Sequence, residues 1–131
     1  FAPFELTRAM SRKILIIEDE VTMRRNVALM LELEGHTPLV ADSGPEGIEM
    51  VRRDRPDLIL CDVMMPGMDG YPVLGMLRAD ESLRGIPFVF LTARGDSQDV
   101  RHGLELGADA YLTKPVTRED LLAAVGACLK E

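Results

Sequence analysis

The sequence predicts an α/β protein built on one parallel sheet with helices on both faces. Short runs of β-branched and leucine residues recur along the chain without polar alternation, and such runs are typical of strands that are buried on both faces. Segments with apolar residues at helical spacing separate these runs. Regular alternation of strand and helix indicates a parallel, doubly wound sheet.

The 131 residues are enough for one domain. We expect this domain to comprise residues 11–131, because residues 1–10 show no sustained hydrophobic period and Met10-Ser11-Arg12-Lys13 looks like a natural start just before the first strand. We interpret residues 1–10 as a remnant of cloning or a disordered tail, and we exclude them from the predicted fold.

The first strand and helix follow directly. Residues 14–17, Ile-Leu-Ile-Ile, form an unalternated run that predicts a buried strand. Apolar residues at Met23, Val27 and Leu31 then predict one buried stripe of a helix. Gly35 ends that helix, because glycine readily adopts the left-handed conformation of a helix end.

The next strand, residues 37–41, is short, and Pro38 near its start suits a position at the edge of the sheet. Ser43 and Glu46 have the spacing of a capping box, which predicts the start of the second helix. The third strand is predicted at residues 57–61, where the run Leu-Ile-Leu-Cys is again unalternated.

The second half of the chain repeats the pattern. A third helix ends near Asp80, and residues 86–91 form the fourth strand. A weak fourth helix spans about 98–106, with Asp96 or Ser97 as its N-cap. Gly103 lies inside this helix, at a cost of about 1 kcal/mol relative to alanine.

The fifth strand is brief, at residues 110–112. Thr117, with Asp120 three residues later, is predicted to cap the last helix. Leu121 and Val125 begin the buried stripe of that helix. The chain therefore contains five strand–helix units.

Composition and charge exclude several function classes. The net charge of −7 argues against sequence-independent binding to nucleic acid, which needs a basic surface. The longest apolar runs are about five to seven residues, well short of the roughly 20 that a membrane span needs. Cys61 and Cys128 lie in apolar segments, and no Cys-x-x-Cys occurs. We expect two reduced thiols and a cytoplasmic location.

The third strand ends in Asp62, and a loop containing Pro66, Gly67 and Gly70 follows. Open α/β sheets bind their ligands at the carboxyl ends of the strands. We interpret Asp62 as a covalent acceptor, a metal ligand or both. The alternative is an ordinary aspartate that opens a turn.

The other strand ends carry polar residues as well. Glu18 and Asp19 follow the first strand, Thr92 ends the fourth, and Lys114 follows the fifth. Because the carboxyl ends of parallel strands share one edge, these residues are predicted to surround Asp62. Any one of them alone is weak support for a site.

Three carboxylates at this edge would repel one another. Two like charges 4 Å apart cost about 4 kcal/mol at an effective dielectric of 20. Three acids and one lysine leave two negative charges, which one divalent cation neutralises. Oxygen ligands without nearby His or Cys favour Mg²⁺, with Mn²⁺ as an alternative. Thr92 can donate to a phosphate, Lys114 can pair with it, and a carboxylate such as Asp62 can form an aspartyl phosphate.

In this order, these motifs resemble the receiver domain of two-component response regulators, over residues 12–131. The matching segments are Glu18-Asp19-Glu20, the run from Asp62 to Gly70, Leu91-Thr92-Ala93 and Lys114-Pro115. The resemblance implies a flavodoxin-like (βα)5 fold with strand order 2-1-3-4-5, as in chemotaxis regulators.

The resemblance also implies the chemistry of the site. Asp62 would accept a phosphoryl group from a histidine kinase or a histidine phosphotransfer protein. Asp19 would bind Mg²⁺ directly and Glu18 through water, and Asp62 and the backbone carbonyl of Met64 would complete the protein ligands. Thr92 and Lys114 would contact the phosphoryl oxygens.

The resemblance also implies how phosphorylation would be passed on to a partner. Tyr111, three residues before Lys114, matches the switch aromatic of the family, and the Lys114–Pro115 bond would be cis. Phosphorylation would switch a partner-binding face made of the fourth helix, fifth strand and fifth helix. The partner would be a downstream protein or an effector domain outside this chain, and the chain would catalyse only its own phosphorylation and dephosphorylation.

Three other interpretations compete with this one. A receiver-like scaffold would bind partners without phosphorylation, although it would not need the full set of site residues. A phosphatase with a haloacid-dehalogenase-like site needs a second acid two residues after the first, where this chain has Met64. A flavodoxin proper would need a phosphate-binding loop after the first strand, where this chain has Glu18 and Asp19.

Overall fold

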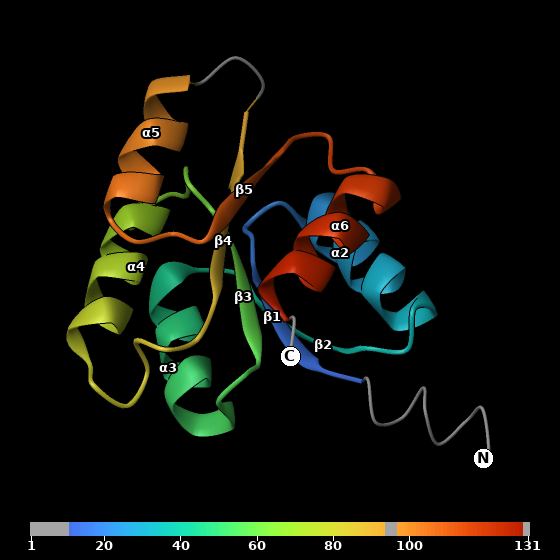
Figure 1. The fold of residues 1–131 in the computed structure, drawn as a ribbon, viewed down its shortest axis with the longest axis horizontal. Helices are drawn as coiled ribbons and strands as arrows, with labels where there is room; N and C mark the ends of the chain where they lie inside the picture. Colours follow the sequence, from blue (N-terminus) through green and yellow to red (C-terminus); the bar gives the residue numbers. More distant parts are fainter. Residues whose placement is uncertain (1–10, 94–96, 130–131) are drawn as a thin grey trace.

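The computed structural model describes residues 11–93 and 97–129, and the interpretation of residues 1–10 lies outside these ranges. Strands and helices alternate throughout the described residues (Figure 1). They are β1 (Lys13–Ile17), α2 (Val21–Leu33), β2 (Thr37–Ala41), α3 (Gly44–Asp54), β3 (Leu58–Asp62), α4 (Gly70–Ala79), β4 (Phe88–Thr92), α5 (Ser97–Glu105), β5 (Ala110–Thr113) and α6 (Arg118–Cys128).

The five strands form one parallel sheet in the order β2-β1-β3-β4-β5, which confirms the predicted order. β3 and β4 are buried along their whole length, and only Lys13 of β1 is exposed. β2 and β5 are the edge strands, and Pro38 lies in β2 as predicted. The strands without polar alternation are thus the central ones, because helices cover both faces there.

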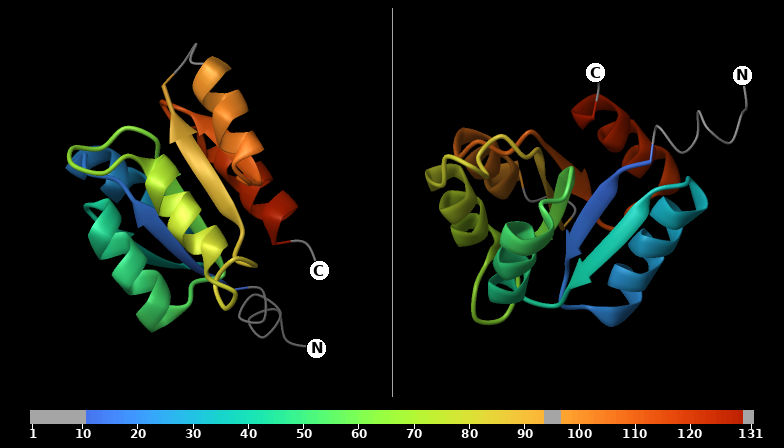
Figure 2. Two further views of the ribbon diagram at one scale, coloured as in Figure 1. Left: turned by 90° about the vertical axis from the view of Figure 1, so that its left-hand side faces the viewer. Right: turned by 90° about the horizontal axis from the view of Figure 1, so that it is seen from below.

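Helices cover the two faces of the sheet in separate layers. Figures 1 and 2 show α3, α4 and α5 on one face and α2 and α6 on the other. Leu15 and Ile17 of β1 belong to the core under the first layer, whereas Ile14 and Ile16 belong to the core under the second. Successive residues of one strand therefore enter different cores, since side chains alternate across a strand.

The helix starts follow local side-chain chemistry. Ser43 Oγ accepts from the Glu46 amide at 3.3 Å, and Thr117 Oγ1 accepts from the Asp120 amide at 3.1 Å, so both predicted caps are confirmed. α2 is capped by Glu20, which the sequence did not single out for this role. Its carboxylate accepts from the amides of Thr22 and Met23 at 3.1 and 2.7 Å. Of the two candidate caps of α5, Asp96 lies outside the described residues.

Close packing explains the glycine inside α5. A Cβ on Gly103 would lie 2.7 Å from the ring of Phe90 in β4, closer than such atoms approach. Phe90 in turn contacts the rings of Phe88 and Tyr71 edge to face. The helix-weakening glycine therefore lets α5 lie directly on an aromatic part of the core.

Arg78 of α4 ties together loops at the amino edge of the sheet. Its guanidinium donates to the carbonyls of Gly107 and Ile86, both at 2.9 Å, and to Asp109 Oδ2 at 3.1 Å. The same Asp109 oxygen accepts the Phe88 amide at 2.8 Å. This clamp anchors the turn between α5 and β5 on α4, at the end of the sheet opposite the strands' carboxyl ends.

Both cysteines are free thiols. Burial raises the pKa of the Cys61 thiol well above its ordinary value, and burial raises the pKa of Cys128 as well. Neither thiol therefore forms a reactive thiolate readily.

In the described part of the chain, every helix is too short or too polar to cross a membrane.

Candidate functional site

The carboxyl edge of the sheet brings together the three predicted acids. One carboxylate oxygen from each of Glu18, Asp19 and Asp62 lies within 4.8 Å of the others. Glu18 is fully buried and Asp62 is 4% exposed, whereas Asp19 faces solvent. In the described part of the chain, this is the one group of three acidic, His or Cys side chains that could hold a metal ion.

Asp62 is held at both of its carboxylate oxygens. The Met64 amide donates to Oδ1 at 3.2 Å, and Lys114 Nζ donates to Oδ2 at 2.7 Å. The loop after Asp62 is closed by the Gly70 amide, which donates to the Val63 carbonyl at 2.8 Å. The side chain of Met64 itself is 68% exposed. The carboxylate is thus fixed in direction before any ligand arrives.

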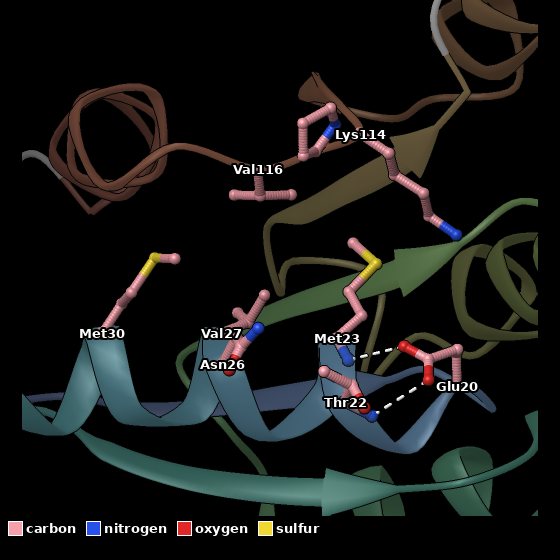
Figure 3. Close-up of a pocket in the computed structure, with 9 residues that line it drawn as sticks. Glu20, Thr22, Met23, Asn26, Val27, Met30, Lys114 and Val116 are labelled. Atoms are coloured by element: carbon pink, nitrogen blue, oxygen red, sulfur yellow. Dashed lines mark hydrogen bonds between the residues drawn. The ribbon is translucent and has the colours of Figure 1, made fainter.

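Lys114 joins two of the acids. Its Nζ lies 3.0 Å from Glu18 Oε1 in addition to its bond with Asp62. Figure 3 shows the side chain extending from the β5–α6 connection toward the end of β3. The Lys114 amide donates to the Thr92 carbonyl at 2.8 Å, which anchors the connection on β4. Burial lowers the pKa of Lys114, but the contacts with Asp62 and Glu18 outweigh it and raise this pKa above its ordinary value.

The crowded, buried surroundings of the acids raise the pKa of Glu18. Burial and then the neighbouring Asp62 raise the pKa of Glu18, the charge of Lys114 opposes the rise, and the result is a pKa of about 8. Neither oxygen of Glu18 has a hydrogen-bond partner, because Lys114 approaches as an ion pair without hydrogen-bond geometry. Buried carboxylate oxygens that accept no hydrogen bond, beside two further acids, fit a hard cation such as Mg²⁺.

This raised pKa predicts how stability depends on pH in protein kept metal-free with EDTA. The folded state holds the Glu18 proton up to about pH 8, whereas the unfolded state releases it near the ordinary glutamate pKa of 4.5. The free energy of unfolding should therefore fall as pH rises between these values. Urea unfolding across the window should show a shallower fall for Glu18→Gln than for the wild type. Asp57→Asn, an exposed change, should keep the wild-type slope, and an equal slope in Glu18→Gln would contradict the prediction.

Thr92 and Tyr111 occupy different surroundings. Thr92 ends β4 with 3% of its surface exposed, and its Oγ1 has no hydrogen-bond partner. Tyr111 pairs with Phe90 in the register of β4 and β5, but its side chain is 45% exposed. The structure thus places Thr92 at the acidic edge and turns Tyr111 outward. The predicted cis bond at Lys114–Pro115 is confirmed.

Arg24 is a site-adjacent residue that the sequence analysis did not identify. Its guanidinium donates to the backbone carbonyls of Glu18 and Asp19. The only sequence signal is a basic residue one helical turn after the acids, and the adjacent Arg25 carries the same signal. Since backbone acceptors leave no pattern in a sequence, the two arginines could not be told apart.

The fold and this edge together define the class of the protein. A flavodoxin-like sheet ordinarily binds its ligand at the carboxyl ends of the strands. Here a cluster of three acids with a paired lysine occupies that position, in a sheet with strand order 2-1-3-4-5. That combination is characteristic of receiver domains.

Comparisons with known proteins give the family. The model of the response regulator receiver domain matches residues 14–126. The phosphate regulon transcriptional regulatory protein PhoB of Escherichia coli is 40% identical over 121 residues, which are 92% of this chain and 53% of that protein. The chain belongs to the response regulator receiver domain family of two-component signalling. It spans about half the length of the curated relatives it matches.

Solved structures agree with this assignment. The receiver domain of a signal transduction histidine kinase from Syntrophus aciditrophicus is 38% identical with a TM-score of 0.83, covering 91% of this chain and 90% of that one. The chemotaxis response regulator CheY4 of Vibrio cholerae is 28% identical with a TM-score of 0.85, covering 92% of this chain and 100% of that one.

Proposed function

We propose that residues 11–131 form a phosphorylation switch in which Asp62 accepts a phosphoryl group from the phosphohistidine of a histidine kinase or a histidine phosphotransfer protein. The bond between phosphorus and the donor imidazole nitrogen breaks, and a bond forms between phosphorus and an Asp62 oxygen. The imidazole takes up a proton as it leaves. The observation that carries this proposal is the Asp62 carboxylate, nearly buried and held at both oxygens.

Lys114 and Thr92 would receive the transferred group. Phosphorylation replaces the single charge of Asp62 with about two negative charges and adds acceptor oxygens. Lys114 Nζ, already 2.7 Å from Asp62, would pair with one phosphoryl oxygen. The unpartnered Thr92 Oγ1 would donate to another. The chain would thus catalyse only its own phosphorylation and dephosphorylation.

Mg²⁺ is the proposed cofactor, with Mn²⁺ as an alternative. Glu18, Asp19, Asp62 and the backbone carbonyl of Met64 would hold it, Glu18 through water. When bound, the ion would neutralise charge on the phosphoryl oxygens. The need for a cation is supported by the three acidic side chains whose oxygens lie within 4.8 Å of one another, beside a single paired lysine.

A groove beside the site suits the approach of the donor. It lies between α2 and the β5–α6 connection and opens next to Lys114 (Figure 3). Its apolar lining would hold the donor protein while its histidine reaches the carboxyl edge. The apolar lining residues are Met23, Val27, Met30, Pro115 and Val116.

The output face is proposed on α5, β5 and α6, in a cytoplasmic protein. Leu104 of α5, Leu106 in the turn after it and Tyr111 of β5 expose 44, 40 and 45% of their surfaces. Movement of Thr92 toward the phosphoryl group would free space into which Tyr111 turns, and this would change the face. A downstream protein or an effector domain outside this chain would bind it.

Mass spectrometry after treatment with acetyl phosphate and Mg²⁺ tests the proposal. We expect one added phosphoryl group on the intact protein and none with EDTA or in Asp62→Asn. Asp57→Asn makes the same change just before β3 and should leave phosphorylation intact. No adduct in the wild type would favour a scaffold that binds without phosphorylation. Continuous release of phosphate from varied phosphoesters would favour a phosphatase.

A further inference from the structure

We propose that Arg24 is a positioning residue for the metal-binding acids, which it aligns by holding the backbone of the β1–α2 loop. This inference rests on the proposed function, since it assumes that Glu18, Asp19 and Asp62 bind a divalent cation. It assigns a role to a side chain that contacts neither the phosphoryl group nor the metal.

The contacts of Arg24 are directed at the acidic loop. Its Nη1 donates to the Glu18 carbonyl at 2.9 Å and lies 3.5 Å from the Asp19 carbonyl. The Arg24 amide donates to the Glu20 carbonyl at 3.0 Å, which starts α2. One half-buried residue thus contacts the backbone of all three residues of the β1–α2 loop.

The backbone of this loop decides where two of the acids point. The Glu18 amide donates to the Ala41 carbonyl at 3.0 Å, so β2 fixes one side of that residue. On the other side, Arg24 holds the carbonyl of Glu18, and it also holds the carbonyl of Asp19. Asp19 is exposed, and its side chain has less packing to direct it than the buried Glu18 has. Holding both carbonyls therefore keeps the Asp19 carboxylate within reach of Asp62.

The charge of Arg24 affects metal affinity in the direction opposite to its positioning role. A guanidinium near the pocket repels a divalent cation, so its removal by charge alone would strengthen metal binding. Loss of positioning would weaken it, because supporting residues around a metal site are typically worth about 10- to 100-fold in affinity. Whether removal of Arg24 strengthens or weakens metal binding thus distinguishes the charge effect from the positioning effect. Arg25, exposed on the same helix, supplies a matched removal of charge.

Manganese binding followed by the electron paramagnetic resonance of free Mn²⁺ tests the proposal without measuring activity. We expect Arg24→Ala to weaken binding by about tenfold, at the lower end of the range for supporting residues. Arg24→Gln, which keeps a donor without the charge, should recover part of the affinity. Arg25→Ala should bind as the wild type does. In phosphorylation by acetyl phosphate, Arg24→Ala should need more Mg²⁺ for half its maximal rate and approach the wild-type rate at saturation.

Unchanged or tighter binding in Arg24→Ala would overturn the proposal, as would an equal loss in Arg25→Ala. If Arg24→Ala does not fold, Arg24→Gln decides, and it should lie between the wild type and Asp19→Asn. Wild-type protein that binds no Mn²⁺, or Asp19→Asn that binds like the wild type, would instead refute the metal site of the proposed function.

Discussion

Replacing Lys114 by methionine is expected to slow phosphorylation of Asp62 by about 100-fold or more, as removal of one charge-stabilising donor does in other active sites. Methionine keeps much of the length of the side chain but removes the ammonium that lies 2.7 Å from Asp62 and 3.0 Å from Glu18. In Lys114→Met, the negative charge of the incoming phosphoryl group lies beside the acids, and the ammonium group that offset this repulsion is absent. The rate of adduct formation from acetyl phosphate at saturating Mg²⁺ measures the effect.

The control for this change is Lys13→Met. Lys13 is exposed at the amino end of β1, where its Nζ donates to the Asp54 carbonyl, and the substitution alters net charge equally. It should leave the phosphorylation rate within about twofold of the wild type, since screened charges at a distance contribute little. A Lys114→Met protein that folds and is phosphorylated at the wild-type rate would exclude the proposed role of Lys114.

The second large effect is expected on stability, from Gly70→Ala. A Cβ on Gly70 would lie 2.4 Å from the Asp62 carbonyl oxygen and 2.8 Å from the ring of Phe90. Neither neighbour can yield easily, because one is backbone of the central strand and the other is a buried ring. Overpacking of this kind costs about 1–3 kcal/mol, and contact with backbone favours the upper part of that range. Urea unfolding of the metal-free protein measures the loss.

Gly75→Ala is the matched control in the same helix. A Cβ on Gly75 meets nothing within 4 Å. Alanine there should stabilise the protein by about 0.5–1 kcal/mol, because it restricts the unfolded chain and favours the helix. We therefore expect Gly70→Ala to lower the free energy of unfolding and Gly75→Ala to raise it. A neutral Gly70→Ala would show that α4 can shift away from Asp62 at little cost.

Much of the fold was predictable because its signals are local. Unalternated runs such as 14–17 identified the buried strands, and the caps at Ser43 and Thr117 were set by residues three positions apart. The site was predictable for a topological reason, since the carboxyl ends of parallel strands share an edge. That rule placed Asp62 beside acids more than forty positions away.

The contacts that sequence reasoning missed lack a residue pattern. Arg24 and Arg78 donate to backbone carbonyls, which every residue carries, so no residue type marks the partner. Glu20 caps α2 through backbone amides, but glutamate is not among the residue types typical of an N-cap. Tertiary geometry alone selects which carbonyl an arginine meets.

The sequence by itself determined the order of the elements, the family and the polar residues at the strand ends. Only the tertiary structure decided how those residues act on one another. It buried Glu18 beside Asp62, which raises the pKa of Glu18 to about 8, directed Lys114 to two carboxylates, and left Tyr111 exposed at the edge. The physical reason is that burial and charge pairing depend on distant segments packing together. The local sequence shows where a strand ends, but not how deeply the residues at that end are buried.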